Sequence, residues 1–171
     1  GLHDMSVAGG DPIVDIGVHC IDTLRYVLQD EVIKVSARAM HDQLSGPMEA
    51  AATLLLEFSR GTLATVNVSF RASYRSPLEI VGTDGTLFAM DALNVERPIT
   101  LQLIREREVV ESEVVSNTSA YAIMLDSFAD SLQGKGTFRV PAEQGWQNQE
   151  ILDAAYRSIR SGTTEEVPQV K

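Results

Sequence analysis

The spacing of hydrophobic positions predicts one helix near the start of this chain and two helices towards its end. Between residues 12 and 28, apolar side chains recur every three or four positions, the period of a helix with one buried face. Residues 121–132 and 142–159 repeat that spacing. Asp11 is suited to capping the first helix and Pro12 to its first turn, because that turn has backbone N–H groups without partners inside the helix.

Between these helices the pattern changes to the period of two that is typical of strands. The clearest alternation falls in residues 62–71, with Ala64, Val66, Val68 and Phe70 on one side and Thr65, Asn67, Ser69 and Arg71 on the other. The other expected strands are residues 31–41, 50–58, 78–81, 86–89, 99–104 and 109–115. Helices kept apart from a run of hairpin strands favour an α+β fold. We expect an open, mostly antiparallel sheet of about six or seven strands with helices packed on one face.

The composition limits the class of protein and of partner. The 171 residues suit a single domain, residues 1–171, and 44% of them are hydrophobic, which is ordinary for a globular protein. A net charge of −10 disfavours nucleic acid and anionic membrane surfaces as partners. Cys20 is the only cysteine and no signal peptide or membrane-spanning stretch is visible, so we expect a cytoplasmic protein.

The candidate chemistry lies in the first predicted helix. Asp15 and His19 are four residues apart, so they share one helix face and can lie side by side. Histidine is the side chain best suited to moving a proton near neutral pH, and a nearby carboxylate can orient it. Spacing alone leaves a structural alternative open, because an acidic residue in the first turn suits the helix dipole and a single helical histidine is often structural.

Three segments resemble, in this order, the C-terminal domain of the Gfo/Idh/MocA oxidoreductases, a family that includes glucose–fructose oxidoreductase and inositol dehydrogenase. The first is the pattern GG-x-P-(I/L)-x-D-x-G-x-H-x-x-D, which residues 9–22 carry. The second, residues 78–87, is similar to the family's strand–turn–strand G-x-x-G-x-(L/I). The third is a pair of closing helices, residues 121–128 and 150–158. The first motif is fairly specific, and the three together span nearly the whole chain.

The resemblance implies the substrate-binding and catalytic half of an NAD(P)-dependent oxidoreductase that acts on a sugar, cyclitol or related polyol. In this family, the residues that match Asp15 and His19 line the substrate pocket. The histidine takes the proton from a hydroxyl, and the aspartate binds a substrate hydroxyl or orients the histidine. Two other functions stay open, a non-catalytic regulatory member of the family and a purely structural oligomerisation module. Retention of both residues argues against the regulator.

The resemblance also places the cofactor outside this chain. In the family, NAD or NADP is bound mainly by an N-terminal Rossmann domain, which also supplies a lysine in an E-K-P motif. Neither is present in these 171 residues. No G-x-G-x-x-G lies between a strand and a helix, and Gly82-Thr83-Asp84-Gly85 falls in a predicted hairpin. We therefore expect no cofactor-binding residues here, and neither cofactor binding nor activity by this chain alone.

Further expectations concern the substrate and a metal. Arg71, Tyr74 and Arg75 follow the best-defined strand, and their donors suit a polyhydroxylated substrate, with ordinary loop polarity as the open alternative. Asp15, His19 and Asp22 do not make the ligand set of a typical single-metal site, so we expect no metal.

Assembly is the last expectation. Helices can cover only one face of the sheet, so the face that carries Thr65, Asn67 and Ser69 should lie open. The resemblance implies that such domains pair through their open sheets. We expect a homodimer or tetramer formed through this face.

Overall fold

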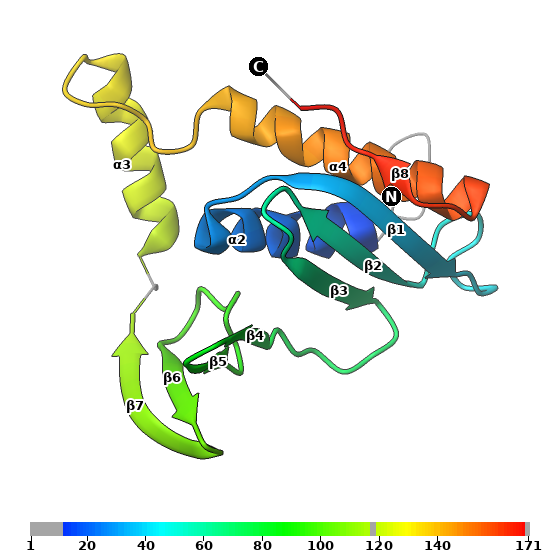
Figure 1. Cartoon of the computed structure of the whole chain (residues 1–171). Helices are drawn as coiled ribbons and strands as arrows, with labels where there is room; N and C mark the ends of the chain where they lie inside the picture. Colours follow the sequence, from blue (N-terminus) through cyan, green and yellow to red (C-terminus); the bar gives the residue numbers. More distant parts are fainter. Residues whose placement is uncertain (1–11, 117–118, 170–171) are drawn as a thin grey trace. The chain divides into compact units, whose positions relative to one another are not determined.

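The computed structural model describes residues 12–116 and 119–169, which divide into two compact units (Figure 1). Unit 1 is Gly1–Ala72 with Val140–Lys171, and unit 2 is Ser73–Arg139. The elements of unit 1 are η1 Ile13–Gly17, α2 Val18–Leu28, β1 Val32–Met40, β2 Ala51–Phe58, β3 Leu63–Ser69, α4 Ala142–Ser161 and β8 Glu165–Glu166. Those of unit 2 are β4 Leu78–Gly82, β5 Gly85–Ala89, β6 Ile99–Arg105, β7 Glu108–Val115 and α3 Ala120–Leu132.

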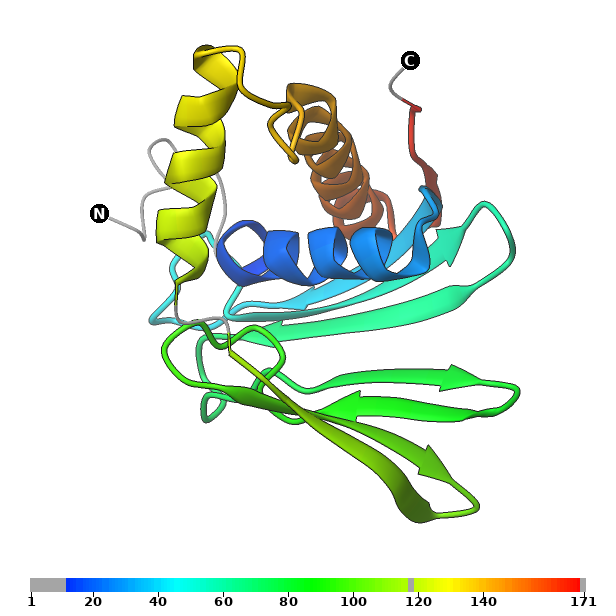
Figure 2. The same cartoon turned by 90° about the vertical axis from the view of Figure 1, so that its left-hand side faces the viewer.

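Unit 1 is built on an antiparallel sheet in the order β3-β2-β1-β8. Helix α4 packs on β1, η1 packs on β3, and α2 contacts α4, so the helices cover one face of the sheet (Figure 2). Alternation of the strands matches this arrangement. Leu54 and Val66 are register partners on β2 and β3 and are buried, whereas their neighbours Thr53 and Thr65 are exposed.

The first strand contains an irregularity that the alternation alone does not predict. A bulge between Val32 and Lys34 changes the register of β1 against β2. Alternation places Ile33 on the same face as Val35, but the extra residue of the bulge buries Val32 and leaves Ile33 only half-buried. Val32 therefore joins Val35 and Ala37 in the core under α4.

Unit 2 contains a second antiparallel sheet, in the order β4-β5-β6-β7, and helix α3. Gly85 starts β5 at φ 148°, and a Cβ there would lie 2.7 Å from the backbone oxygen of Ile104. The β6–β7 turn holds Glu106 at φ 50° and Arg107 at φ 71°. Two successive left-handed residues make the type I′ geometry that suits the twist of a two-residue hairpin.

The predicted α+β class with open antiparallel sheets is confirmed. The eight strands divide into two sheets of four rather than forming a single sheet, and the short strand β8 lacked a sequence signal. The first helix spans the expected residues but begins with the π turn η1, and the cap expected at Asp11 lies outside the described residues. Within the part of the chain that is described, no helix is long and apolar enough to cross a membrane.

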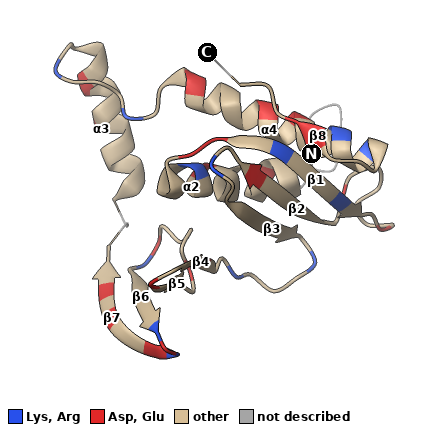
Figure 3. Cartoon of the chain, in the orientation of Figure 1, with Lys and Arg blue, Asp and Glu red and all other residues tan. Residues whose placement is uncertain are grey.

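The negative charge of the chain is shared between the two units. Figure 3 shows acidic positions along α4 in unit 1 and along β7 in unit 2. On β7 these are Glu108, Glu111 and Glu113, and every residue of that strand is exposed. The charge is therefore distributed over both units, which is consistent with a role in solubility.

Candidate active site

Asp15 and His19 lie on one continuous helical segment, at the junction between η1 and α2. The backbone N–H of Val18 donates to the carbonyl of Ile13, the five-residue spacing that defines a π turn. Asp15 lies within that turn and His19 is the second residue of α2; both are exposed, whereas Ile13 and Gly17 are buried. Short π segments occur often at functional sites, and this one presents Asp15 to solvent one turn before the exposed His19.

Among the described residues, no hydrogen bond joins Asp15 to His19. Cys20, next in the chain, is half-buried, and burial raises the pKa of its thiol. A thiol held protonated in this way is a poor nucleophile, which agrees with a packing role for Cys20.

The start of this segment is held by Glu49, a buried carboxylate in the connection between β1 and β2. Its Oε1 accepts a hydrogen bond from the backbone N–H of Ile13 at 3.3 Å. The same oxygen accepts one from the Tyr156 hydroxyl of α4 at 2.8 Å. Glu49 therefore connects η1 to α4.

The other end of α2 is held by Arg25, which is 4% exposed. Its Nε and Nη2 reach the two carboxylate oxygens of Glu31 at 2.7 and 2.9 Å. Its Nη1 donates to Oδ1 of Asn148 at 2.6 Å, and its Nη2 donates to Oε1 of Gln144 at 2.7 Å. The amide of Asn148 in turn donates to Asp22 at 2.8 Å, which makes Asp22 a structural acceptor between the helices.

Sequence reasoning missed both anchors, although each left a signal. Arg25 follows Ile21 by four residues, so it occupies a core-facing position of α2. Glu49 stands between Met48 and Ala50, which are both fully buried. The signal is a charged residue at a position where the apolar pattern predicts burial. Such a residue needs a partner, because burying an unpaired charge is costly.

The three predicted substrate-loop residues are divided between the units. Arg71 belongs to unit 1, and its Nε lies 2.6 Å from Oδ2 of Asp42 while its Nη2 donates to Ser45 at 2.9 Å. This guanidinium, aided by the Ser45 hydroxyl, holds the pKa of Asp42 well below its usual range. Tyr74 and Arg75 belong to unit 2 and are both exposed. Arg71 thus binds two residues of the β1–β2 connection, whereas the side chains of Tyr74 and Arg75 are exposed.

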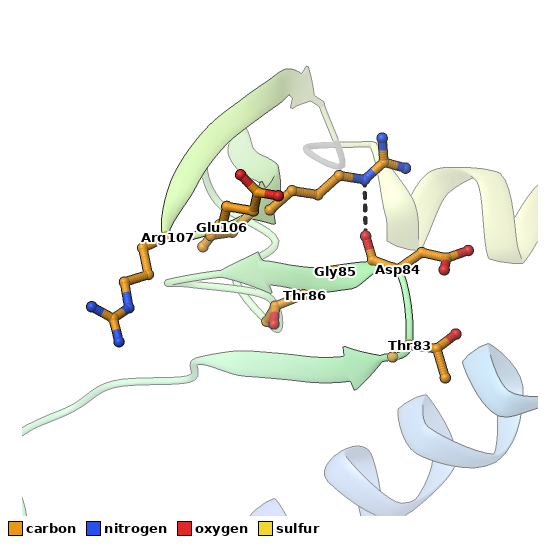
Figure 4. A pocket seen from close by; sticks show the side chains of 9 residues that line it. Thr83, Asp84, Gly85, Thr86, Glu106 and Arg107 are labelled. Atoms are coloured by element: carbon orange, nitrogen blue, oxygen red, sulfur yellow. Dashed lines mark hydrogen bonds between the residues drawn. The ribbon is translucent and has the colours of Figure 1, made fainter.

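A depression of about 500 Å³ lies at the hairpin tips of unit 2 (Figure 4). It is lined by residues 82–86 and 104–107. Arg105 donates through Nε to the backbone oxygen of Asp84 at 2.9 Å, while the side chain of Arg107 points away from Asp84. None of the predicted site residues lines this depression, and no helix begins at its glycines. It therefore does not resemble a phosphate cradle.

Comparison with known proteins gives consistent matches. A sequence model described as "Oxidoreductase family, C-terminal alpha/beta domain" matches residues 4–168. D-glucoside 3-dehydrogenase of Escherichia coli K12 is 24% identical over 93% of this chain and 49% of its own length. 1,5-Anhydro-D-fructose reductase of Ensifer adhaerens is 27% identical over 81% of this chain and 42% of its own length. The chain spans about half the length of these relatives.

A solved structure shares the fold. Levoglucosan dehydrogenase in complex with NADH and levoglucosan superposes with a TM-score of 0.78 at 18% identity, covering 98% of this chain and 53% of that one. The α+β fold described above is therefore the fold of this structure too, at a level of sequence identity that speaks for the fold alone.

Proposed function

This chain belongs to the Gfo/Idh/MocA oxidoreductase family as its C-terminal α/β domain, and we propose that it is the substrate-binding half of an NAD(P)-dependent dehydrogenase acting on a sugar, cyclitol or related polyol. The names of the relatives support a carbohydrate substrate, because both act on sugars or sugar derivatives. Their length, about twice the matched region, supports a second domain that acts together with this one.

The described residues do not fit the dinucleotide itself. Its phosphates need a glycine-rich turn that leads into a helix N-terminus, but Gly82 and Gly85 close the β4–β5 hairpin and no helix follows them. We assign NAD or NADP to a nucleotide-binding domain outside these residues. Only the proton chemistry falls to this chain.

We propose that His19 is the general base and that Asp15 holds the substrate. Oxidation of an alcohol removes a hydride from carbon and a proton from the attached hydroxyl. Nε2 or Nδ1 of His19 accepts that proton, and the Asp15 carboxylate accepts a hydrogen bond from a substrate hydroxyl or from the imidazole. The observation that carries this assignment is the exposure of both side chains, one turn apart, on a helical segment whose two ends are anchored by Glu49 and Arg25.

The test is His19→Ala in the polypeptide that joins this chain to its nucleotide-binding domain. We expect kcat to fall by at least about a hundredfold, the lower range for loss of a general base, without loss of folding. His41→Ala is the matched control, because His41 is an exposed histidine outside the π-turn segment. Full activity of the His19→Ala enzyme would return His19 to a structural role. Saturable micromolar binding of NAD(H) to the isolated chain, measured by calorimetry, would contradict the assignment of the cofactor to a separate nucleotide-binding domain.

Tyr74 and Arg75 are proposed as substrate contacts, and Arg71 as a weaker one because Asp42 and Ser45 already occupy its guanidinium. Tyr74→Phe and Arg75→Ala should raise KM and leave kcat nearly unchanged, as expected for uniform binding. If neither variant changes KM, these side chains are ordinary loop residues.

A structural oligomerisation module is the second candidate, and the open face of the unit 1 sheet favours it. That face carries Leu55, Leu63 and Met40, which are 37%, 64% and 49% exposed, beside Thr65 and Asn67. Under both candidate functions, we propose that two copies of the chain pair through this face, as a homodimer or within a tetramer. Light scattering at micromolar concentration tests the assembly, and Leu55→Asp should shift the mass to that of a monomer. The His19→Ala variant then separates the two candidates. It should strongly lower the activity of an enzyme, whereas a purely structural module has only its assembly to lose and should assemble as before.

A further inference from the structure

A buried carboxylate outside the Asp15–His19 pair contacts the segment that carries them. Glu49 is 2% exposed, and its backbone is fixed on both sides. The N–H of Ala50 donates to the carbonyl of Met40 at 2.7 Å, and the N–H of Met48 donates to that of Ser45 at 3.2 Å. The Glu49 carboxylate therefore projects from a rigid part of the β1–β2 connection.

This carboxylate contacts the helical segment at its start. Pro12 stands at the N-cap position and no side-chain cap is present there. Oε1 of Glu49 instead accepts from the N–H of Ile13, thirty-six residues earlier in the chain. A negative charge at this end of a helix also interacts favourably with its dipole. The long-range contact thus gives the first N–H of η1 an acceptor.

Tyr156 orients the carboxylate of Glu49. Its hydroxyl donates to the same oxygen at 2.8 Å, and it stands on α4 beside Ala155 and near Leu152, which are buried in the core. Because α4 packs on β1, the hydrogen bond from Tyr156 orients the carboxylate relative to the sheet. The first turn of η1 is consequently placed by the core of unit 1.

We infer that Glu49 is a positioning residue for the proposed site, oriented by Tyr156. It fixes the start of η1, two residues before Asp15, while Arg25 fixes α2 six residues after His19. With both ends held, the rotation of the segment about its axis is set, and so is the direction in which Asp15 and His19 project. The inference rests on the proposed function, since it assigns Glu49 to the same reaction.

Two variants and one control test it. Glu49→Ala removes the acceptor, and Tyr156→Phe removes only the hydroxyl that orients it. Ser158→Ala is the control: Ser158 is fully buried on the same helix, where its Oγ accepts from Ala37 N–H at 2.9 Å and donates to the Thr163 carbonyl at 2.5 Å. Ser158→Ala removes both of these hydrogen bonds without touching η1.

In the complete enzyme, Glu49→Ala should lower kcat by about tenfold and Tyr156→Phe by a few-fold, with KM nearly unchanged, because a general base displaced by a fraction of an ångström acts less often. Ser158→Ala should lower stability but leave kcat unchanged. In the 171-residue chain, amide hydrogen exchange of residues 13–18 should accelerate in Glu49→Ala and Tyr156→Phe and not in the control.

The outcomes separate this inference from the proposed function. If the unmodified enzyme oxidises no polyol, or His19→Ala keeps full activity, the proposed function fails and the inference fails with it. If His19→Ala is impaired but both Glu49→Ala and Tyr156→Phe keep the parent kcat, only the inference is overturned. Should Glu49→Ala not fold, Tyr156→Phe decides alone. Unchanged exchange of residues 13–18 in that variant also overturns the anchoring.

Discussion

The two units of this molecule differ in how their sheets are stabilised. In unit 1, helices cover one face of β1–β3, and among the described residues every buried apolar side chain but one belongs to this unit. The exception is Ala89 of unit 2, where the strands are otherwise half-buried or exposed. Unit 1 depends on apolar burial, whereas unit 2 depends on its hydrogen-bonded ladders and on the geometry of its turns. The unit with the apolar core is the one that carries the proposed catalytic pair.

The largest difference should appear on truncating a leucine in each sheet. Leu54 of β2 is fully buried, whereas Leu103 of β6 is half-buried. We expect Leu54→Ala to lower the free energy of unfolding by about 2–5 kcal/mol, and Leu103→Ala by about 1 kcal/mol or less. Urea unfolding monitored by the fluorescence of Trp146, the only tryptophan and a residue of α4, measures the loss in unit 1, and hydrogen exchange of residues 78–115 measures the loss in unit 2. Equal losses for the two variants would remove the distinction between the units.

A second difference concerns glycines. Gly85 has φ 148° and no space for a Cβ, so Gly85→Ala should destabilise unit 2 by about 1–3 kcal/mol. Gly17→Ala is the matched control in unit 1. Its Cβ would meet nothing closer than 3.7 Å at an ordinary helical φ, and the alanine should stabilise by about 0.5–1 kcal/mol. Hydrogen exchange of residues 78–115 and 13–28 measures both effects, and a tolerated Gly85→Ala would contradict the close approach to Ile104.

The β6–β7 turn offers a gain of stability in unit 2. Glu106 and Arg107 occupy left-handed conformations that asparagine and glycine adopt more easily. Replacing the pair by Asn-Gly should stabilise the hairpin by about 1 kcal/mol and slow the exchange of β6 and β7 amides. A Lys-Lys replacement, which keeps two side chains with Cβ atoms, should give no such gain. Equal exchange in both variants would show that the turn does not limit this sheet.

The smallest effect is confined to acid. In unit 1, the Ser59 hydroxyl, followed by the N–H groups of Arg60 and Glu31, lowers the pKa of Asp30 to about 2. A carboxyl with a lowered folded-state pKa contributes stability that is fully present above its unfolded value of 3.8 and is lost as pH falls towards 2. Unfolding free energy should therefore decline between pH 4 and 2 more steeply in the parent than in Asp30→Asn. Parallel pH curves would contradict this assignment.

Local pattern was sufficient for much of the fold. The period of two in residues 62–71 and the helical spacing of residues 142–159 identified β3 and α4 within two residues of their observed ends. The same spacing placed Asp15 and His19 one turn apart on one helical segment. These features depend on neighbours within a few positions, so the local periodicity of the sequence is enough to predict them.

Long-range packing decided the rest. The bulge at Ile33, the pairing of β8 with β1 and the division of the strands into two sheets arise between segments that lie far apart in the chain. The anchors of the proposed site arise in the same way, since Arg25 meets Asn148 across 123 positions and Glu49 meets Tyr156 across 107. A periodic pattern records which side of an element is buried. It does not record which distant polar group will satisfy a buried charge, because that depends on the three-dimensional approach of the elements.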